Sequence, residues 1–331
     1  MLKDKLGRKM RDLRVSVTDR CNFRCAYCMP LDQYEWIDRK EILSFEEIAR
    51  IAAIFIRLGI EKIRLTGGEP LLRRDLHQLV SRLAPLPGLR DLCLTTNGSL
   101  LAKAAPALAA AGLKRLNVSL DTLDEEKFQR MSGRNELPRV LEGLAAARDC
   151  GIGPIKLNAV LERGVNDDEI VKLADFARRN GFAMRFIEFM DVGNVNAWKA
   201  DRIVPKKEML EKIHAWMPLR ESGRERGSAP SVDYEYADGS GEVGFIASVT
   251  EPFCGACTRI RVTADGKLVT CLFSERGENL KALLRSGAGD EEISRFISNV
   301  WELRSDRYSE ERAELLKSGT RRKIEMIRLG G

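Results

Sequence analysis

Residues 12–28 read DLRVSVTDRCNFRCAYC, a short apolar run followed at once by three closely spaced cysteines. The β-branched run Leu13–Val17 predicts a buried strand, and the cysteines come directly after its carboxyl end. They are Cys21, Cys25 and Cys28, in C-x3-C-x2-C spacing. Three thiolates can bind three irons of a four-iron cubane and leave the fourth iron open to a ligand. A closed zinc site would need a fourth ligand from elsewhere, such as His77 or His214.

A second group of three cysteines lies near the carboxyl end of the chain. It consists of Cys254, Cys257 and Cys271, in C-x2-C-x13-C spacing. We expect a second open cubane there, although by itself this spacing also suits zinc. The chain has eight cysteines, and the other two, Cys93 and Cys150, are expected to act as buried apolar side chains.

Six apolar, β-branched segments separated by helical patterns predict an α/β fold with a parallel sheet and right-handed crossovers. The segments are Leu13–Val17, Lys62–Leu65, Leu89–Leu94, Leu116–Leu120, Ile155–Val160 and Ala183–Phe189. Six strands are fewer than the eight of a closed barrel. The pattern therefore leaves two architectures open, a doubly wound open sheet and a partial barrel.

Polar or glycine-rich residues follow most of these predicted strands. They are Thr66–Pro70, Thr95–Gly98, Ser119 with Asp121, and Glu188 with Met190. The carboxyl ends of parallel strands meet at one edge of the sheet, where α/β proteins bind their ligands. The sequence therefore predicts an active site at that edge, beside the first cysteine triplet.

The regular alternation ends near residue 200, and we place a domain boundary at about residue 220. Residues 221–230 read ESGRERGSAP, which is typical of an exposed loop or linker. Short strands and helices are predicted beyond it, at Val232–Tyr236, Glu242–Ile246, Arg259–Thr263, Leu268–Cys271, Asn279–Arg285 and Glu291–Glu302.

The composition is that of a globular protein, since 44% of the 331 residues are apolar and 31% are charged. Residues 1–14 are charged, and no apolar run approaches the roughly 20 residues of a membrane span, so we expect a cytoplasmic protein without a membrane partner. A net charge of +6 without a basic run allows an anionic ligand but predicts no nucleic-acid partner. The chain has no G-x4-G-K-[ST] motif, which disfavours a P-loop phosphatase.

The first triplet with Tyr27, followed by the TGGEP run Thr66–Pro70, resembles the radical S-adenosylmethionine (SAM) superfamily. From about residue 5 to residue 331 the chain is also similar to the GTP 3′,8-cyclase family of molybdenum cofactor biosynthesis. The segments that carry this similarity are Asp12–Cys25, Lys62–Pro70, Leu94–Gly98, Asn117–Asp121, Arg185–Met190, Phe253–Arg261 with Cys271, and Gly330–Gly331.

The resemblance implies a partial (βα)6 TIM-type barrel over residues 5–220, the radical SAM core. A smaller α+β C-terminal domain over residues 221–331 would cap the barrel mouth and carry the second cluster and the GTP site. The family is homodimeric, so a homodimer is implied as well.

The resemblance also implies which residues bind which group. The first triplet would hold a [4Fe–4S] cluster that binds SAM, and the second triplet a [4Fe–4S] cluster whose open iron binds the guanine of GTP. Contacts to SAM would come from Tyr27, Gly68, Ser119 and Met190. Contacts to GTP would come from Arg14, Arg64, Thr95, Lys156, Arg259, Ile260 and Arg261, of which Arg14, Arg259 and Arg261 would be catalytic. Guanidinium groups match phosphate oxygens in bidentate pairs, whereas most other Lys and Arg residues are expected to be solvated surface charges.

In the implied reaction, a 5′-deoxyadenosyl radical from SAM removes the C3′ hydrogen of GTP, and the carbon radical closes onto C8. An electron and a proton then complete (8S)-3′,8-cyclo-7,8-dihydroguanosine 5′-triphosphate, which the family passes to the cyclic pyranopterin monophosphate synthase. The Gly330–Gly331 ending would reach into the active site, with a frayed terminus as the alternative.

Two other functions fit parts of the sequence. One is a peptide-modifying radical SAM maturase, but the C-terminal domains of these enzymes usually carry more cysteines than the three found after residue 250. The other is a non-enzymatic iron–sulfur carrier or zinc module, which predicts closure by four cysteines and no cleavage of SAM.

Overall fold

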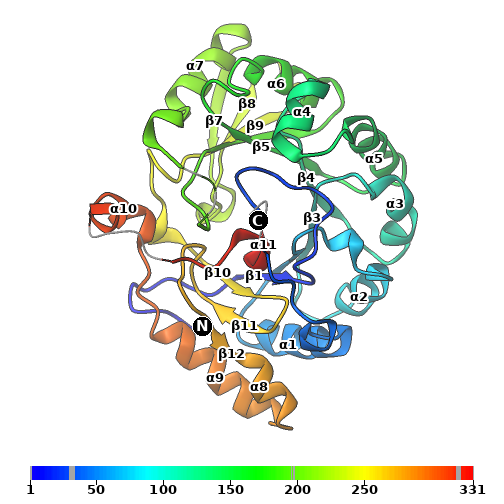
Figure 1. Ribbon diagram of the computed structural model, residues 1–331, viewed down its shortest axis with the longest axis vertical. Coiled ribbons are helices and arrows are strands. Elements are labelled where there is room, and N and C mark those ends of the chain that lie inside the picture. Colours follow the sequence, from blue (N-terminus) through cyan, green and yellow to red (C-terminus); the bar gives the residue numbers. More distant parts are fainter. Residues whose placement is uncertain (1, 30–33, 195, 197, 318–321, 331) are drawn as a thin grey trace.

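The computed structural model describes residues 2–29, 34–194, 196, 198–317 and 322–330. Its centre is one curved sheet of twelve strands (Figure 1). Six strands form the middle of the sheet in chain order, each parallel to the next. They are β1 (Asp12–Ser16), β2 (Lys62–Thr66), β3 (Asp91–Thr96), β4 (Arg115–Ser119), β5 (Ile155–Leu161) and β6 (Ala183–Glu188). The six predicted strands are therefore confirmed.

Two strands from the last third of the chain lengthen this parallel arc. β10 (Arg259–Val262) pairs with β1, and β9 (Glu242–Ile246) pairs with β6, so eight neighbouring strands are parallel. In the described part of the chain no pairing joins β9 to β10, so the arc stays open along that seam. Of the two architectures that the sequence left open, the partial barrel is the one observed. Antiparallel strands complete the two edges: β11 (Lys267–Val269), β12 (Glu278–Asn279), β8 (Val232–Tyr236) and β7 (Leu219–Gly223).

Helices cover the outer face of the curved sheet (Figure 1). They are α1 (Phe45–Arg57), α2 (Leu76–Leu83), α3 (Leu101–Ala110), α4 (Glu125–Ser132), α5 (Leu137–Asp149), α6 (Ile170–Arg179) and α7 (Lys206–Trp216). The first helix begins at a capping box, since the Glu47 backbone N–H donates to Ser44 Oγ at 3.1 Å and the Ser44 N–H donates to Glu47 Oε2 at 2.7 Å.

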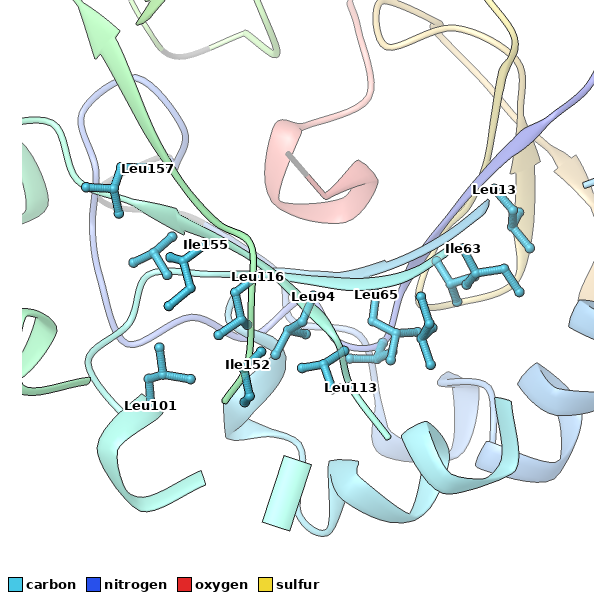
Figure 2. Packing of buried hydrophobic residues seen from close by; sticks show 14 of the residues in the cluster. Leu13, Ile63, Leu65, Leu94, Leu101, Leu113, Leu116, Ile152, Ile155 and Leu157 are labelled. Atoms are coloured by element: carbon cyan, nitrogen blue, oxygen red, sulfur yellow. The ribbon is translucent and has the colours of Figure 1, made fainter. Parts of the chain in front are cut away.

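Alternation along the strands divides their side chains between two faces. Figure 2 shows leucines and isoleucines of the strands, such as Leu13, Ile63 and Leu116, on the face that packs against the outer helices. The intervening residues, such as Arg14 and Arg64, line the inner face instead, because successive side chains of a strand point to opposite sides. The apolar core therefore lies outside the barrel strands, and the inner face is left for polar chemistry.

In the carboxyl-terminal third, the described residues form four further α-helices. They are α8 (Leu280–Arg285), α9 (Asp290–Glu302), α10 (Tyr308–Lys317) and α11 (Met326–Leu329). The short helix α11 lies within the barrel, above the inner face of the sheet (Figures 1 and 2). One sheet runs through both parts of the chain, and the expected division at about residue 220 stays a prediction.

The predicted exposed loop at residues 221–230 is wrong in part. Its first residues belong to β7, and the following segment 224–230 packs against the inner face near the start of the strands. Glu225 lies 3.5 Å from Arg115 of β4, and Arg224 donates to the carbonyl oxygen of Pro230 at 2.8 Å. Glu225, one of the charged residues that predicted exposure, is instead part of an ion pair. None of the helices in the described ranges is long and apolar enough to cross a bilayer.

Candidate active site

A cavity of about 300 Å³ lies inside the barrel, within the size range of ligand-binding sites. All six cysteines of the two triplets line it, although the triplets come from opposite ends of the chain. The structure thus places both candidate metal sites in one chamber. The four arginines predicted to bind GTP line the same cavity: Arg14, Arg64, Arg259 and Arg261.

The first triplet lies on the loop after β1, and the TGGEP run after β2 packs against that loop. A Cβ on Gly67 would stand 2.5 Å from the carbonyl oxygen of Thr18, and one on Gly68 would stand 2.4 Å from that of Arg20. A side chain at either position would force the two loops apart, so glycine is required. The motif's glycines therefore fix the cysteine loop against the end of β2.

Glu69 of the same run ties the loops after β2 and β3 together. Its carboxylate accepts hydrogen bonds from Thr96 Oγ1 at 2.7 Å, from the Asn97 N–H at 2.7 Å and from the Leu71 N–H at 2.9 Å. The side chain is fully buried, and this burial raises the pKa of Glu69 to about 7.

A second buried carboxyl holds the aromatic residue of the first triplet. Tyr27 donates to Asp121 Oδ2 at 2.7 Å, while Asp121 Oδ1 accepts from the Val160 N–H at 2.8 Å. Burial raises the pKa of Asp121 to about 6. Burial also raises the pKa values of the nearby thiols, that of Cys21 to about 11 and that of Cys28 to about 12. These thiols need a positively charged partner such as iron to ionise at neutral pH.

The second triplet lies beside β10 and β11, and two arginines reach one of its sulfurs. Cys254 begins the short 3-10 turn Cys254–Ala256, and Cys257 follows it. Arg259 places Nε and Nη2 each 3.3 Å from Cys257 Sγ, and Arg304 places Nη2 3.2 Å from the same atom. Burial alone would raise the pKa of Cys257, but the two guanidiniums lower it to about 6.

Three arginines lie side by side on the inner face because β10, β1 and β2 are in register. Arg14 faces Arg261 on one side and Arg64 on the other. Burial, followed by the charges of Arg261 and Arg64, lowers the pKa of Arg14, and burial with the charge of Arg259 lowers that of Arg261 to about 10. Arg64 donates to the neutral Thr95 hydroxyl at 2.9 Å. Guanidiniums crowded in this way, with uncharged partners, favour a ligand with several negative charges.

Most of the other predicted site residues also line the cavity: Tyr27, Gly68, Thr95, Ser119 and Met190. Two do not. Lys156, at the start of β5, lies in a separate pocket and pairs with Glu242 at 3.2 Å. Ile260 has its side chain in the apolar core, because its neighbours Arg259 and Arg261 take the inward positions of β10.

The carboxyl-terminal tail enters the barrel, as the resemblance implied. Gly330 has φ of +71°, and its carbonyl oxygen accepts a hydrogen bond from Arg261 Nη1 at 2.9 Å. Asp191, which directly follows Met190, anchors two residues that precede the tail. Its carboxylate accepts hydrogen bonds from Arg312 Nε at 2.9 Å and from Lys323 Nζ at 2.7 Å. Gly331 lies outside the described residues.

The arrangement of the thiols does not match a site for a single zinc ion among the described residues. In the ranges that the structure describes, no three His, Cys, Asp or Glu side chains are grouped so that they could hold one metal ion. In a cubane each thiolate binds a different iron, so its three sulfurs stand farther apart than around a single ion. The proposed fourth zinc ligands are also elsewhere, since His214 accepts from the Leu219 N–H at 3.1 Å and His77 lies on α2.

Several site residues were missed by the sequence analysis. Arg185 on β6 lines the cavity, and its inward position could have been found from the alternation beside Ile187. Arg8 and Arg304 also line the cavity, but they lie in charged segments where nothing in the sequence marks them. Asp4 pairs with both of these arginines and was missed for the same reason.

Two family models match the chain. The model of the radical SAM superfamily matches residues 15–177, and the model described as Molybdenum Cofactor Synthesis C matches residues 182–310. The first match contains the first cysteine triplet and the strands β2 to β5, and the second contains the second triplet.

Curated relatives match over almost the whole chain. A protein of Acidothermus cellulolyticus named GTP 3′,8-cyclase is 52% identical over 94% of this chain and 89% of its own length. Proteins of the same name from Xanthomonas axonopodis pv. citri and Staphylococcus haemolyticus are 46% and 44% identical over 100% of this chain and 99% of their own lengths.

Solved structures support the fold. The Streptococcus suis protein SuiB, bound to S-adenosylmethionine, has a TM-score of 0.62 at 16% identity, covering 92% of this chain and 68% of that one. Because the identity is so low, this likeness concerns the fold alone. The two family models and the curated relatives agree with the motifs on both sides of the cavity. The chain therefore belongs to the GTP 3′,8-cyclase family of the radical SAM superfamily.

Proposed function

We propose that this chain is a GTP 3′,8-cyclase of molybdenum cofactor biosynthesis. It would remove the C3′ hydrogen of GTP and join C3′ to C8, giving (8S)-3′,8-cyclo-7,8-dihydroguanosine 5′-triphosphate. The observation that carries the proposal is the shared cavity, which is lined by both thiol triplets and by a group of partly or fully buried arginines. The named relatives, at 44–52% identity, support the same reaction.

The first triplet would hold a [4Fe–4S] cluster through Cys21, Cys25 and Cys28. Together with SAM, such a cluster would supply the 5′-deoxyadenosyl radical that starts the reaction. Tyr27, Gly68, Ser119 and Met190 are proposed to orient SAM, and all four line the cavity. Asp121 and Glu69 fix the loops on which these residues lie.

The arginines Arg14, Arg64 and Arg261 are proposed to bind the triphosphate and to orient the ribose. Their charges compete in the absence of a ligand, and a polyanion removes that competition. Arg259 is proposed to act at the junction between substrate and second triplet, since it lines the cavity and donates to Cys257 Sγ. Lys156 and Ile260 would have to act from outside the cavity, Lys156 by its charge and Ile260 by its backbone.

Five finer points also belong to this proposal. The second triplet, Cys254, Cys257 and Cys271, would hold a second [4Fe–4S] cluster that binds the guanine of GTP. The enzyme would work in the cytoplasm as a homodimer, with domains divided at about residue 220. Its product would pass to the cyclic pyranopterin monophosphate synthase.

The experiment that tests the function uses GTP deuterated at C3′. The anaerobically reconstituted chain is incubated with SAM, dithionite and this GTP. The products are separated by liquid chromatography, and their masses are measured by mass spectrometry. Deuterium in 5′-deoxyadenosine, together with a cyclised nucleotide, supports the proposal. Formation of 5′-deoxyadenosine without deuterium, while GTP stays intact, would contradict it.

A further inference from the structure

The end of α9 brings a buried arginine to the second cysteine triplet. Arg304 lies two residues beyond α9 and is 4% exposed. Its Nη2 donates to Cys257 Sγ at 3.2 Å, and its Nη1 donates to the carbonyl oxygen of the same residue at 2.9 Å. One guanidinium therefore fixes both the backbone and the sulfur of one candidate iron ligand.

A second arginine from the amino-terminal segment braces the first. Arg8 is 4% exposed, and its Nη1 donates to the carbonyl oxygens of Cys254 at 2.9 Å and Asp306 at 2.8 Å. The Asp4 carboxylate joins the two arginines, at 2.5 Å from Arg8 Nε and 3.5 Å from Arg304 Nη1. Buried charge pairs of this kind hold their groups in one geometry, because separating the partners would leave a buried charge uncompensated.

One hydrogen-bond donor in this group of Asp4, Arg8 and Arg304 has no acceptor among the described residues. Arg8 Nη2 is buried and has no hydrogen-bond partner among the described residues, although Arg8 lines the cavity. A buried donor without an acceptor costs free energy. It therefore favours an acceptor supplied by a group bound beside the second triplet.

The second triplet also has a carboxylate near it, that of Asp306, whose Oδ2 lies 3.4 Å from Arg304 Nε. The first triplet has two carboxyl groups beside it, those of the buried Glu69 and the partly buried Asp121, and among the described residues no guanidinium donates to its sulfurs. Its neighbouring cation, Arg24, donates to the carbonyl oxygen of Cys21 at 2.8 Å and not to a sulfur. Among the described residues, the charged side chains that donate to a cysteine sulfur are Arg259 and Arg304, both at Cys257.

This difference matters for electron affinity. Taking up one electron makes a [4Fe–4S] cluster more negative by one charge. Guanidinium charges and N–H donors at the cysteine sulfur stabilise that charge, whereas nearby carboxylates oppose it. The effect is largest for buried groups, because the protein interior screens charges weakly.

We propose that Arg304, held by Asp4 and Arg8, is a positioning residue for the second triplet and raises the reduction potential of its cluster above that of the first cluster. The inference rests on the proposed function, because it requires a cluster at each triplet. It concerns electron affinity and ligand geometry, and it assigns Arg304 no contact with GTP.

A redox titration of the loaded chain tests this inference. Wild type, Arg304→Gln and Arg304→Lys are reconstituted anaerobically, their iron and sulfide are counted, and dithionite titrations are followed by electron paramagnetic resonance. Cys25→Ala and Cys271→Ala each remove one cysteine from one triplet. The midpoint that is lost in each variant identifies the cluster to which that midpoint belongs. We expect the wild-type second midpoint to be the higher one, Arg304→Gln to lower it, and Arg304→Lys, which keeps the charge but loses the paired donors, to lower it less.

The control is Arg295→Gln, which removes a positive charge from α9, the helix that leads to Arg304. Arg295 is exposed, so water screens its charge, and we expect both midpoints to stay as in wild type. The first-cluster midpoint should stay unchanged in every Arg304 variant. A general loss of folding would move both midpoints or the iron content, so a shift confined to the second midpoint separates positioning from structural damage.

Each outcome decides the inference. A wild-type second midpoint no higher than the first, or an unshifted midpoint in an iron-replete Arg304→Gln chain, would overturn it. If Arg304→Gln fails to hold the second cluster, Arg304→Lys decides: a lowered midpoint supports the inference, and an unchanged one overturns it. A wild-type chain with one cluster would overturn the proposed second site as well, whereas two clusters with unshifted midpoints would overturn this inference alone.

Discussion

Arg261 donates a hydrogen bond to the carbonyl oxygen of Gly330 at 2.9 Å, so an inward-facing arginine of β10 holds the end of the chain inside the barrel. Gly330 is closely packed, since a Cβ at this position would lie 2.4 Å from Thr66 Cγ2 at the end of β2. The tail thus lies between Arg261 and Thr66, the first residue of the TGGEP motif.

Gly330→Ala should therefore displace the tail. Gly330 has φ of +71° and ψ of 126°, a backbone conformation that L residues rarely adopt; it costs an alanine about 1–3 kcal/mol, and the contact with Thr66 adds to that cost. We expect at least about a tenfold loss of cyclisation, which corresponds to about 1.4 kcal/mol, with unchanged iron content. The matched control is Gly151→Ala, at φ of +74° with nothing within 4 Å of its Cβ. Equal turnover of the two variants would show that the tail plays no part.

Arg14→Met should weaken GTP binding without weakening the fold. Arg14 lies between Arg261 and Arg64 on neighbouring strands, so its removal relieves repulsion in the substrate-free chain. We expect GTP affinity to fall at least about tenfold, or about 1.4 kcal/mol, while the substrate-free unfolding temperature does not fall. Thermal unfolding with and without GTP measures both. Arg139→Met, on an arginine whose side chain is 66% exposed, should change neither, and a lower substrate-free stability for Arg14→Met would count against this account.

Glu69 should make the metal-free chain less stable as the pH rises. Its pKa in the folded chain is about 7, above the ordinary 4.5, so the folded state holds the proton more tightly than the unfolded state does. The free energy of unfolding should therefore fall between pH 4.5 and pH 7, by up to about 3 kcal/mol from this group. Glu69→Gln should flatten that part of the profile, measured by urea unfolding at several pH values. Glu126→Gln, on an exposed side chain of α4, is the control; identical profiles for wild type and Glu69→Gln would refute the assignment.

Asp191→Asn should loosen the tail. The Asp191 carboxylate accepts from Arg312, Lys323 and Tyr308, and these three donors would lose their charged partner. Breaking a buried pair of this kind costs about 3 kcal/mol, so amide exchange in α10 and α11 should rise by about a hundredfold, as seen by mass spectrometry. Asp149→Asn, on a side chain that is 70% exposed, should leave exchange unchanged. Protection equal to wild type in both helices would show that the tail is held by other contacts.

Much of the fold could be predicted because local patterns match it. The β-branched run Leu13–Val17 and its five counterparts became strands, and the Ser44 capping box begins α1 where the sequence placed it. The position of residues 242–246 and 259–262 as the seventh and eighth parallel strands could not be predicted, because short strands carry no signal for their distant partners. Segment 224–230 was misjudged because Glu225 meets its partner, Arg115 of β4, only in the folded chain.

The candidate site divides in the same way. The cysteines and the TGGEP run have characteristic spacing, so they were found from the sequence, and the structure places all six cysteines at one cavity. The frame of Asp4, Arg8 and Arg304 joins segments about 300 residues apart, and no local pattern predicts such a meeting. Lys156 was predicted at the site from resemblance alone, and its place in a separate pocket follows from its position at the beginning of β5 rather than its end.

The most direct test of the central claim is a count of iron and sulfide in anaerobically reconstituted protein, for wild type and for Cys271→Ala. Two open cubanes in one cavity predict about eight irons per wild-type chain and about four in the variant. The variant should still cleave SAM but should not cyclise GTP, because the first triplet is intact. Zinc in place of iron, or about four irons in both proteins, would contradict the account.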